Sequence, residues 1–106
     1  MPVPLEDLLT ELKSRLTALY GARLKGLCLY GSYARGEQQN ESDVDILIIL
    51  DRIGHYSLEI ERTSELISEL SLKYHRSISR LFVTEDDWKN RDTPFLANAR
   101  EEAILA

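Results

Sequence analysis

Residues 29–50 read LYGSYARGEQQNESDVDILIIL, and this stretch decides the fold. A short apolar run ends at Gly31, and a polar, glycine-bearing segment follows over residues 31–42. Residues 44–50 are then nearly all apolar and rich in β-branched side chains. This pattern predicts a strand, a turn with a loop, and a central strand that is covered on both faces.

The flanking sequence adds helices on both sides of this stretch. Leucines at helical spacing precede it and stop at Gly21, which is typical of an amphipathic helix. The other predicted elements are a helix over 5–20, a strand over 24–30, a helix over 57–75, a strand over 77–83, a short helix opened by a capping box at Thr84, and a last helix from Pro94 through Ile104. This order predicts one α/β (α+β) domain over residues 1–106, with a mixed sheet of about three to four strands flanked by helices.

Length and charge limit the classes of function. The chain has 106 residues, of which 43% are hydrophobic and 29% charged, as expected for one folded domain. Eighteen acidic residues against 13 basic ones give a formal net charge of −5. This balance argues against a nucleic-acid-coating protein, because phosphate neutralisation needs a basic face. A small anionic substrate stays compatible if a cation or local donors meet its phosphates.

The cysteine content and the apolar runs indicate a compartment. Cys28 is the only cysteine, so an internal disulfide is excluded and a reducing compartment is favoured. The first seven residues lack the features of a signal peptide, and the longest apolar run, residues 46–50, is too short to span a bilayer. We therefore expect a cytoplasmic protein without a membrane segment.

The glycine-rich turn follows directly after a strand, where backbone N–H groups can point at an anion. It is not a P-loop, because Glu37 rather than lysine follows Gly36. It is not a dinucleotide fingerprint either, because Tyr33 occupies a position that requires glycine. Two interpretations stay open: a phosphate-binding turn, or a tight connection that needs Gly31 for its backbone angles.

Two aspartates stand at the start of the central strand. Because side chains alternate along a strand, Asp43 and Asp45 should point to the same face, about 6.6 Å apart along it. At an effective dielectric of about 20, two such charges repel by roughly 2.5 kcal/mol. A cation would relieve this repulsion, and carboxylates together with substrate phosphates suit Mg²⁺. The alternative is a pair of solvated acids at a strand end.

The turn and the acids together form a recognisable motif. Gly31-Ser32, ten intervening residues and then DVD over residues 43–45 resemble the signature of the minimal nucleotidyltransferases of the DNA polymerase β superfamily. The predicted order of helices and strands over residues 5–83 agrees with the fold of that family. The resemblance covers about three quarters of the chain.

The resemblance implies roles for individual residues. Gly31 and Ser32 would bind the triphosphate of ATP or another nucleoside triphosphate, and Asp43 and Asp45 would be the catalytic ligands of Mg²⁺. Arg35 would be a further contact to the phosphates, with a solvated surface arginine as the alternative. The implied reaction transfers a nucleotidyl group, AMP from ATP, to a protein or small-molecule acceptor and releases pyrophosphate.

One part of the family pattern is missing. The family usually carries a third carboxylate on a later strand, but residues 77–83 (SISRLFV) contain no acid. Ser79 or Arg80 stands about where the acid belongs. An alternative function is therefore a degenerate, non-catalytic module that binds a nucleotide or a partner.

The resemblance also implies a protein partner. Stand-alone domains of this kind resemble the antitoxin halves of two-component modules whose partner is a helical HEPN-type protein, and a tyrosine of that partner can be the acceptor. Large apolar residues near the C-terminus offer a partner face, with packing in the core as the favoured alternative: Trp88, Phe95, Leu96, Ile104 and Leu105.

Overall fold

The computed structural model describes residues 5–31 and 43–105. Its elements are α1 (Leu5–Tyr20), the 3₁₀ turn η1 (Gly21–Arg23), β1 (Leu24–Tyr30), β2 (Val44–Leu50), α2 (Tyr56–Tyr74), β3 (Ile78–Thr84), α3 (Glu85–Asn90), α4 (Pro94–Glu102) and β4 (Ile104–Leu105). The strands and helices predicted from the sequence up to residue 90 are all present, with bounds that differ by one or two residues.

The strands form one four-stranded mixed sheet in the order β3-β2-β1-β4. β1 runs antiparallel to both β2 and β4, while β3 runs parallel to β2. β2 therefore lies inside the sheet, and the connection from β2 to the parallel strand β3 is made by α2. This arrangement confirms the predicted fold class.

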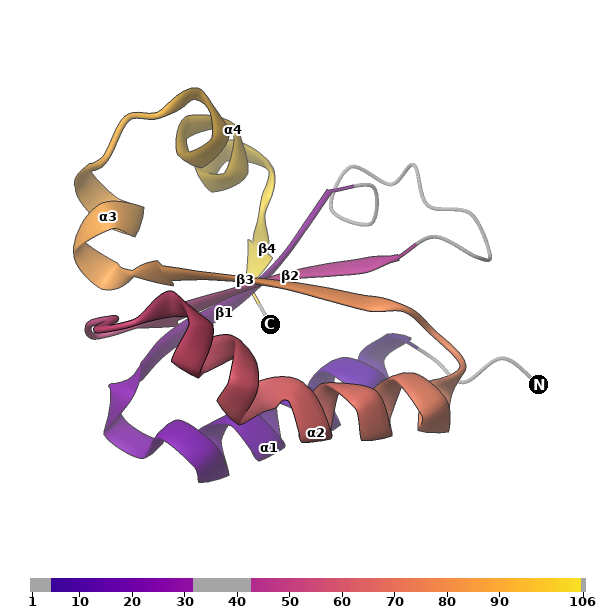
Figure 1. The fold of residues 1–106 in the computed structure, drawn as a ribbon. Helices are drawn as coiled ribbons and strands as arrows, with labels where there is room; N and C mark the ends of the chain where they lie inside the picture. The colour runs from indigo at the N-terminus through magenta and orange to yellow at the C-terminus, as the bar shows by residue number, and fades with distance from the viewer. Residues whose placement is uncertain (1–4, 32–42, 106) are drawn as a thin grey trace.

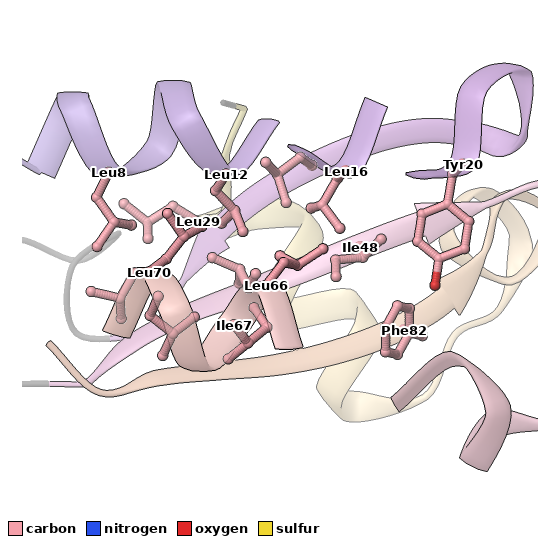
Figure 2. Close-up of a cluster of buried hydrophobic side chains, with 14 of the residues drawn as sticks. Leu8, Leu12, Leu16, Tyr20, Leu29, Ile48, Leu66, Ile67, Leu70 and Phe82 are labelled. Carbon is pink, nitrogen blue, oxygen red and sulfur yellow. The ribbon is translucent and has the colours of Figure 1, made fainter. Parts of the chain in front are cut away.

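Helices cover both faces of the sheet. α1 and α2 lie side by side on one face, and α3 and α4 lie over the other (Figure 1). The main core lies between α1, α2 and the sheet, and Figure 2 shows Leu8, Leu12 and Leu16 of α1 pointing into it. Leu8, Leu12 and Leu16 are at most 1% exposed. The helical leucine spacing thus marks a buried face.

The apolar run of β2 over residues 46–50 reflects burial on both faces of the sheet. Ile46 and Ile48 belong to the core under α1 and α2. Leu47 and Ile49 belong to a second, smaller cluster on the other face, which also contains Leu96 of α4. Each residue from Ile46 to Leu50 is buried, so a polar residue in this run would lose its hydration on either side.

The last two helices begin at the predicted caps. The Thr84 hydroxyl accepts a hydrogen bond from the Asp87 N–H at 3.1 Å. The Thr93 hydroxyl accepts one from the Leu96 N–H at 3.3 Å, and Pro94 is the first residue of α4. Among the described helices, none combines the length and the apolar character that crossing a bilayer requires.

The predicted end of the last helix is wrong. α4 ends at Glu102, Ala103 is extended (φ −66°, ψ 142°), and Ile104 and Leu105 form β4. β4 pairs with Leu29 and Cys28 of β1 and so covers part of that edge of the sheet. Helical spacing of apolar residues continued to Ile104, but pairing with a distant strand overrides it, since two residues carry little local preference.

Candidate active site

The C-terminal end of β1 and the N-terminal end of β2 meet at one end of the sheet. Tyr30, the last residue of β1, is the antiparallel partner of Asp45. Gly31 follows Tyr30, and Asp43 immediately precedes β2. The start of the glycine-rich turn and the acidic pair are therefore neighbours in space.

Gly31 lies directly against the Asp45 side chain. Its φ is +74°, a backbone conformation that favours glycine. A Cβ atom added to Gly31 would come closer than 3.0 Å to Oδ2 of Asp45 and would lie 3.2 Å from its Cγ. Glycine is therefore required here for two reasons: the backbone angle and the close approach of the carboxylate.

The two aspartates differ in their surroundings. Asp45 is half-buried and shares its face of β2 with Leu47 and Ile49, as strand alternation predicted. Asp43 is exposed and lies just outside the strand, whose start is held by a 2.8 Å hydrogen bond from the Val44 N–H to the Ser77 carbonyl. One carboxylate is thus partly shielded at the sheet end, and the other faces water.

Two aromatic residues extend the surroundings of Asp45. Burial and the negative charge of Asp45 both raise the pKa of the Tyr30 hydroxyl, so this tyrosine lies within the electrostatic field of the carboxylate. The Phe95 ring of α4 packs edge-to-face on the Tyr30 ring, with 5.8 Å between their centroids. The position of Tyr30 near Asp45 was not predicted from the sequence, although Tyr30 directly precedes Gly31.

The strand register decides which residue occupies the position of the missing third carboxylate. Asp45 is the partner of Ser79 across the parallel pair β2 and β3, and Ser79 is exposed. Arg80 belongs to the opposite face, because its Nε donates to the Thr63 hydroxyl at 2.7 Å and its Nη2 to the Ile60 carbonyl at 2.9 Å. Of the two residues considered from the sequence, only Ser79 fits this position.

Ser32 and Arg35 are the remaining predicted site residues. Both lie outside the described residues, so their contacts to phosphate stay predictions. Within residues 5–31 and 43–105, no group of three or more His, Cys, Asp or Glu side chains is arranged to hold a metal ion. Apart from Asp43 and Asp45, the described part of the chain thus offers no third side-chain ligand of these types for a metal at this site.

The sheet order and the position of Gly31 beside Asp45 agree with the family expected from the sequence. The chain matches the model of the nucleotidyltransferase domain over residues 5–103 and belongs to that family. This match confirms the resemblance found in the sequence: the protein is a minimal nucleotidyltransferase.

Two similar proteins have names that specify adenylyl transfer to a protein. A protein of Methanocaldococcus jannaschii, provisionally named a protein adenylyltransferase, is 33% identical over 98 residues, which cover 92% of each chain. The protein adenylyltransferase MntA of Thermococcus cleftensis is 38% identical over 69 residues, which cover 65% of this chain and 68% of that protein.

Solved structures share the fold at low sequence identity. A Sulfolobus solfataricus protein described as a nucleotidyltransferase superposes with a TM-score of 0.67 at 18% identity, covering 93% of this chain and 76% of that one. A toxin–antitoxin complex with AMP-PNP gives a TM-score of 0.64 at 17% identity, with 96% and 72% covered. At this identity the structures support the fold alone.

Proposed function

We propose that residues 1–106 act as one nucleotidyltransferase domain that transfers AMP from ATP to a hydroxyl group of a protein acceptor. The observation that carries this proposal is the contact between Gly31 and Asp45, which joins the phosphate-binding turn expected from the sequence to a carboxylate. The names of the M. jannaschii and T. cleftensis relatives support adenylyl as the group transferred and a protein as its acceptor.

The donor atoms at this end of the sheet fit Mg²⁺. Asp43 and Asp45 offer carboxylate oxygens, and Mg²⁺ is typically held by one or two carboxylates together with substrate phosphates and water. Asp43 is exposed and Asp45 half-buried, so both can reach a ligand that approaches from solvent. A bound Mg²⁺ would neutralise charge on the triphosphate as the transition state develops.

The residues of the turn would hold the other side of the triphosphate. Gly31, Ser32 and Arg35 are the proposed contacts, through backbone N–H groups, a hydroxyl and a guanidinium.

In the proposed reaction, the acceptor oxygen would attack the α-phosphorus, a new P–O bond would form, and the bond to pyrophosphate would break. The acceptor proton would leave to solvent. Most of the rate acceleration in such a reaction comes from positioning and charge neutralisation.

We further propose a helical HEPN-type protein as the partner and a tyrosine of that partner as the acceptor, so that the chain serves as an antitoxin. The toxin–antitoxin complexes among the structural neighbours support a partner protein. The partner can also supply the acceptor-binding surface that a domain of this size has little room to build.

A second candidate function is a non-catalytic module that binds a nucleotide or a partner. The specific observation in its favour is that Ser79, a neutral residue, is the register partner of Asp45 where the family usually has a third carboxylate. A site with two carboxylates would still hold one metal with its nucleotide, while a second metal would be poorly supplied with ligands.

Transfer of labelled AMP to the partner protein distinguishes the nucleotidyltransferase from the non-catalytic module. The chain is incubated with Mg²⁺, ATP labelled at the α-phosphate, and the protein encoded by the adjacent gene as the candidate partner. The enzyme interpretation predicts label on the partner and its loss with Asp45→Asn. Retained Mg·ATP binding without label on any acceptor would contradict it and favour the non-catalytic module.

A further inference from the structure

The Tyr30 and Phe95 rings form a small aromatic surface on the same side of the sheet as Asp45. Their planes are nearly perpendicular, at 87°. The edge of one ring thus meets the face of the other, a favourable arrangement for aromatic pairs. Tyr30 is half-buried, whereas Phe95 stays 44% exposed, so part of the Phe95 ring is available to a ligand.

The exposure of Phe95 differs in location from that of other large apolar residues. The other exposed large hydrophobic side chains among the described residues belong to α1 or α2, which cover the opposite face of the sheet: Leu19, Tyr56, Leu58 and Leu72. A single exposed apolar residue needs no explanation by itself. Phe95 is distinct because it contacts the strand neighbour of a carboxylate at the candidate active site.

The helix that carries Phe95 is held firmly. Arg100 Nη1 donates to the Trp88 carbonyl at 2.7 Å and to the Arg91 carbonyl at 2.8 Å. Leu96, next to Phe95, is 7% exposed and packs in the second core cluster with Leu47. The ring therefore projects from a helix anchored by these hydrogen bonds and by Leu96, which lowers the entropy lost when a ligand stacks on it.

We propose that Phe95, supported by Tyr30, forms the subsite that receives the base of the nucleoside triphosphate. This inference rests on the proposed function, which places the triphosphate against the turn that begins at Gly31 and beside the metal held by Asp43 and Asp45. Only the ribose separates the base from the α-phosphate, so the base has to lie close to these residues. Every nucleobase has an aromatic face, so stacking favours bases in general and discriminates weakly between adenine and guanine.

A ligand with a base and one without it distinguish binding of the base from binding of the phosphates. Titration calorimetry with Mg²⁺ present measures the Kd of AMP-PNP and of inorganic tripolyphosphate, which has no base. For Phe95→Ala we expect AMP-PNP to bind about tenfold more weakly and tripolyphosphate to bind as it does to the wild type. Phe95→Trp keeps a ring and should bind AMP-PNP at least as well as the wild type.

A matched control is Leu58→Ala, because Leu58 is 42% exposed and lies on the opposite side of the sheet. It should change neither Kd. Unchanged AMP-PNP binding by Phe95→Ala, or equal weakening of both ligands, would overturn the base subsite. Failure of the wild type to bind either ligand would overturn the proposed nucleotide site itself, and the base subsite with it.

Discussion

Asp45 of β2 and Ser79 of β3 are register partners across a parallel strand pair. Neighbouring strands lie about 4.8 Å apart, so the two side chains start from adjacent points on the same face of the sheet. The position next to the half-buried carboxylate therefore carries a neutral hydroxyl. Among the described residues, the acidic pair at this end of the sheet consists of Asp43 and Asp45.

Replacing Ser79 with aspartate should add a metal ligand. Without metal, the new charge beside Asp45 should lower the free energy of unfolding by about 1–3 kcal/mol through repulsion. With Mn²⁺ and AMP-PNP, the variant should bind one more Mn²⁺ per chain than the wild type. Equilibrium denaturation and Mn²⁺ titration measure the two effects.

Ser79→Asn is the uncharged control and should show neither change. Equal Mn²⁺ stoichiometry in Ser79→Asp and the wild type would show that position 79 does not face the metal.

Gly31→Ala should damage the site as well as the fold. The positive φ costs an alanine about 1–2 kcal/mol, and the new methyl group would push the Asp45 carboxylate away. We expect lower stability together with at least tenfold weaker binding of Mg·AMP-PNP, measured by denaturation and calorimetry.

Gly21→Ala isolates the backbone effect. Gly21 also has a positive φ, +56°, but an added Cβ would meet no atom within 4 Å. This variant should lose a similar amount of stability and keep its affinity for the nucleotide. If both glycine variants lose affinity equally, the contact with Asp45 is not what matters for binding.

Glu59, a buried carboxylate far from Asp45, should affect the stability of the fold but not the binding of the nucleotide. Glu59 is 2% exposed, accepts a hydrogen bond from the Tyr20 hydroxyl at 2.9 Å and pairs with Arg23 and Arg62 at 3.2 Å. Glu59→Ala leaves the buried tyrosine hydroxyl without its acceptor, and we expect a loss of roughly 2–3 kcal/mol in the free energy of unfolding.

The matched control is Glu69→Ala in the same helix, because Glu69 forms an exposed ion pair with Arg15. It should cost less than about 1 kcal/mol. Nucleotide affinity should stay unchanged in both variants under conditions where they are folded. A similar cost for both would mean that burial of Glu59 contributes little.

Stability should fall in acid partly because of Glu11. A hydrogen bond from the Tyr74 hydroxyl, then one from Lys73, lowers the pKa of this carboxyl below its ordinary value of 4.5. A lowered folded-state pKa means that the contribution is complete above the unfolded value and is lost as the pH falls through the folded one. Glu11→Gln should therefore flatten the dependence of unfolding free energy on pH below about 4.5.

Denaturant unfolding between pH 3 and 6 (about the range in which carboxyl groups titrate) measures this change. Glu61→Gln, at an exposed position of α2, is the control and should leave the wild-type slope in place. A Glu11→Gln variant with the full wild-type slope would assign the acid sensitivity to other groups.

Most of the fold could be predicted because its signals are local. The leucine spacing of α1, the apolar run of β2 over residues 46–50 and the threonine caps of α3 and α4 are each contained in one segment. β4 could not be predicted, because its two residues have no periodicity and depend on pairing with β1. Its existence follows from where α4 ends, which is a property of the packed chain.

The site was predictable only in part for the same reason. Alternation predicted that Asp43 and Asp45 point to the same face, whereas the closeness of the turn depends on which strands pair. The choice between Ser79 and Arg80 needed the register of β3, which no local pattern provides. Phe95 is fifty residues from Asp45 in the chain, and the path of α4 alone brings its ring onto Tyr30.

Metal-dependent nucleotide binding by Asp45→Asn tests the central claim most directly. Calorimetry would compare AMP-PNP binding with and without Mg²⁺ for the wild type and this variant, with circular dichroism to verify that both are folded. We predict that Mg²⁺ tightens binding to the wild type at least tenfold and has little effect on the folded variant. An equal gain from Mg²⁺ in both proteins would contradict the claim that Asp45 holds the metal of the nucleotide.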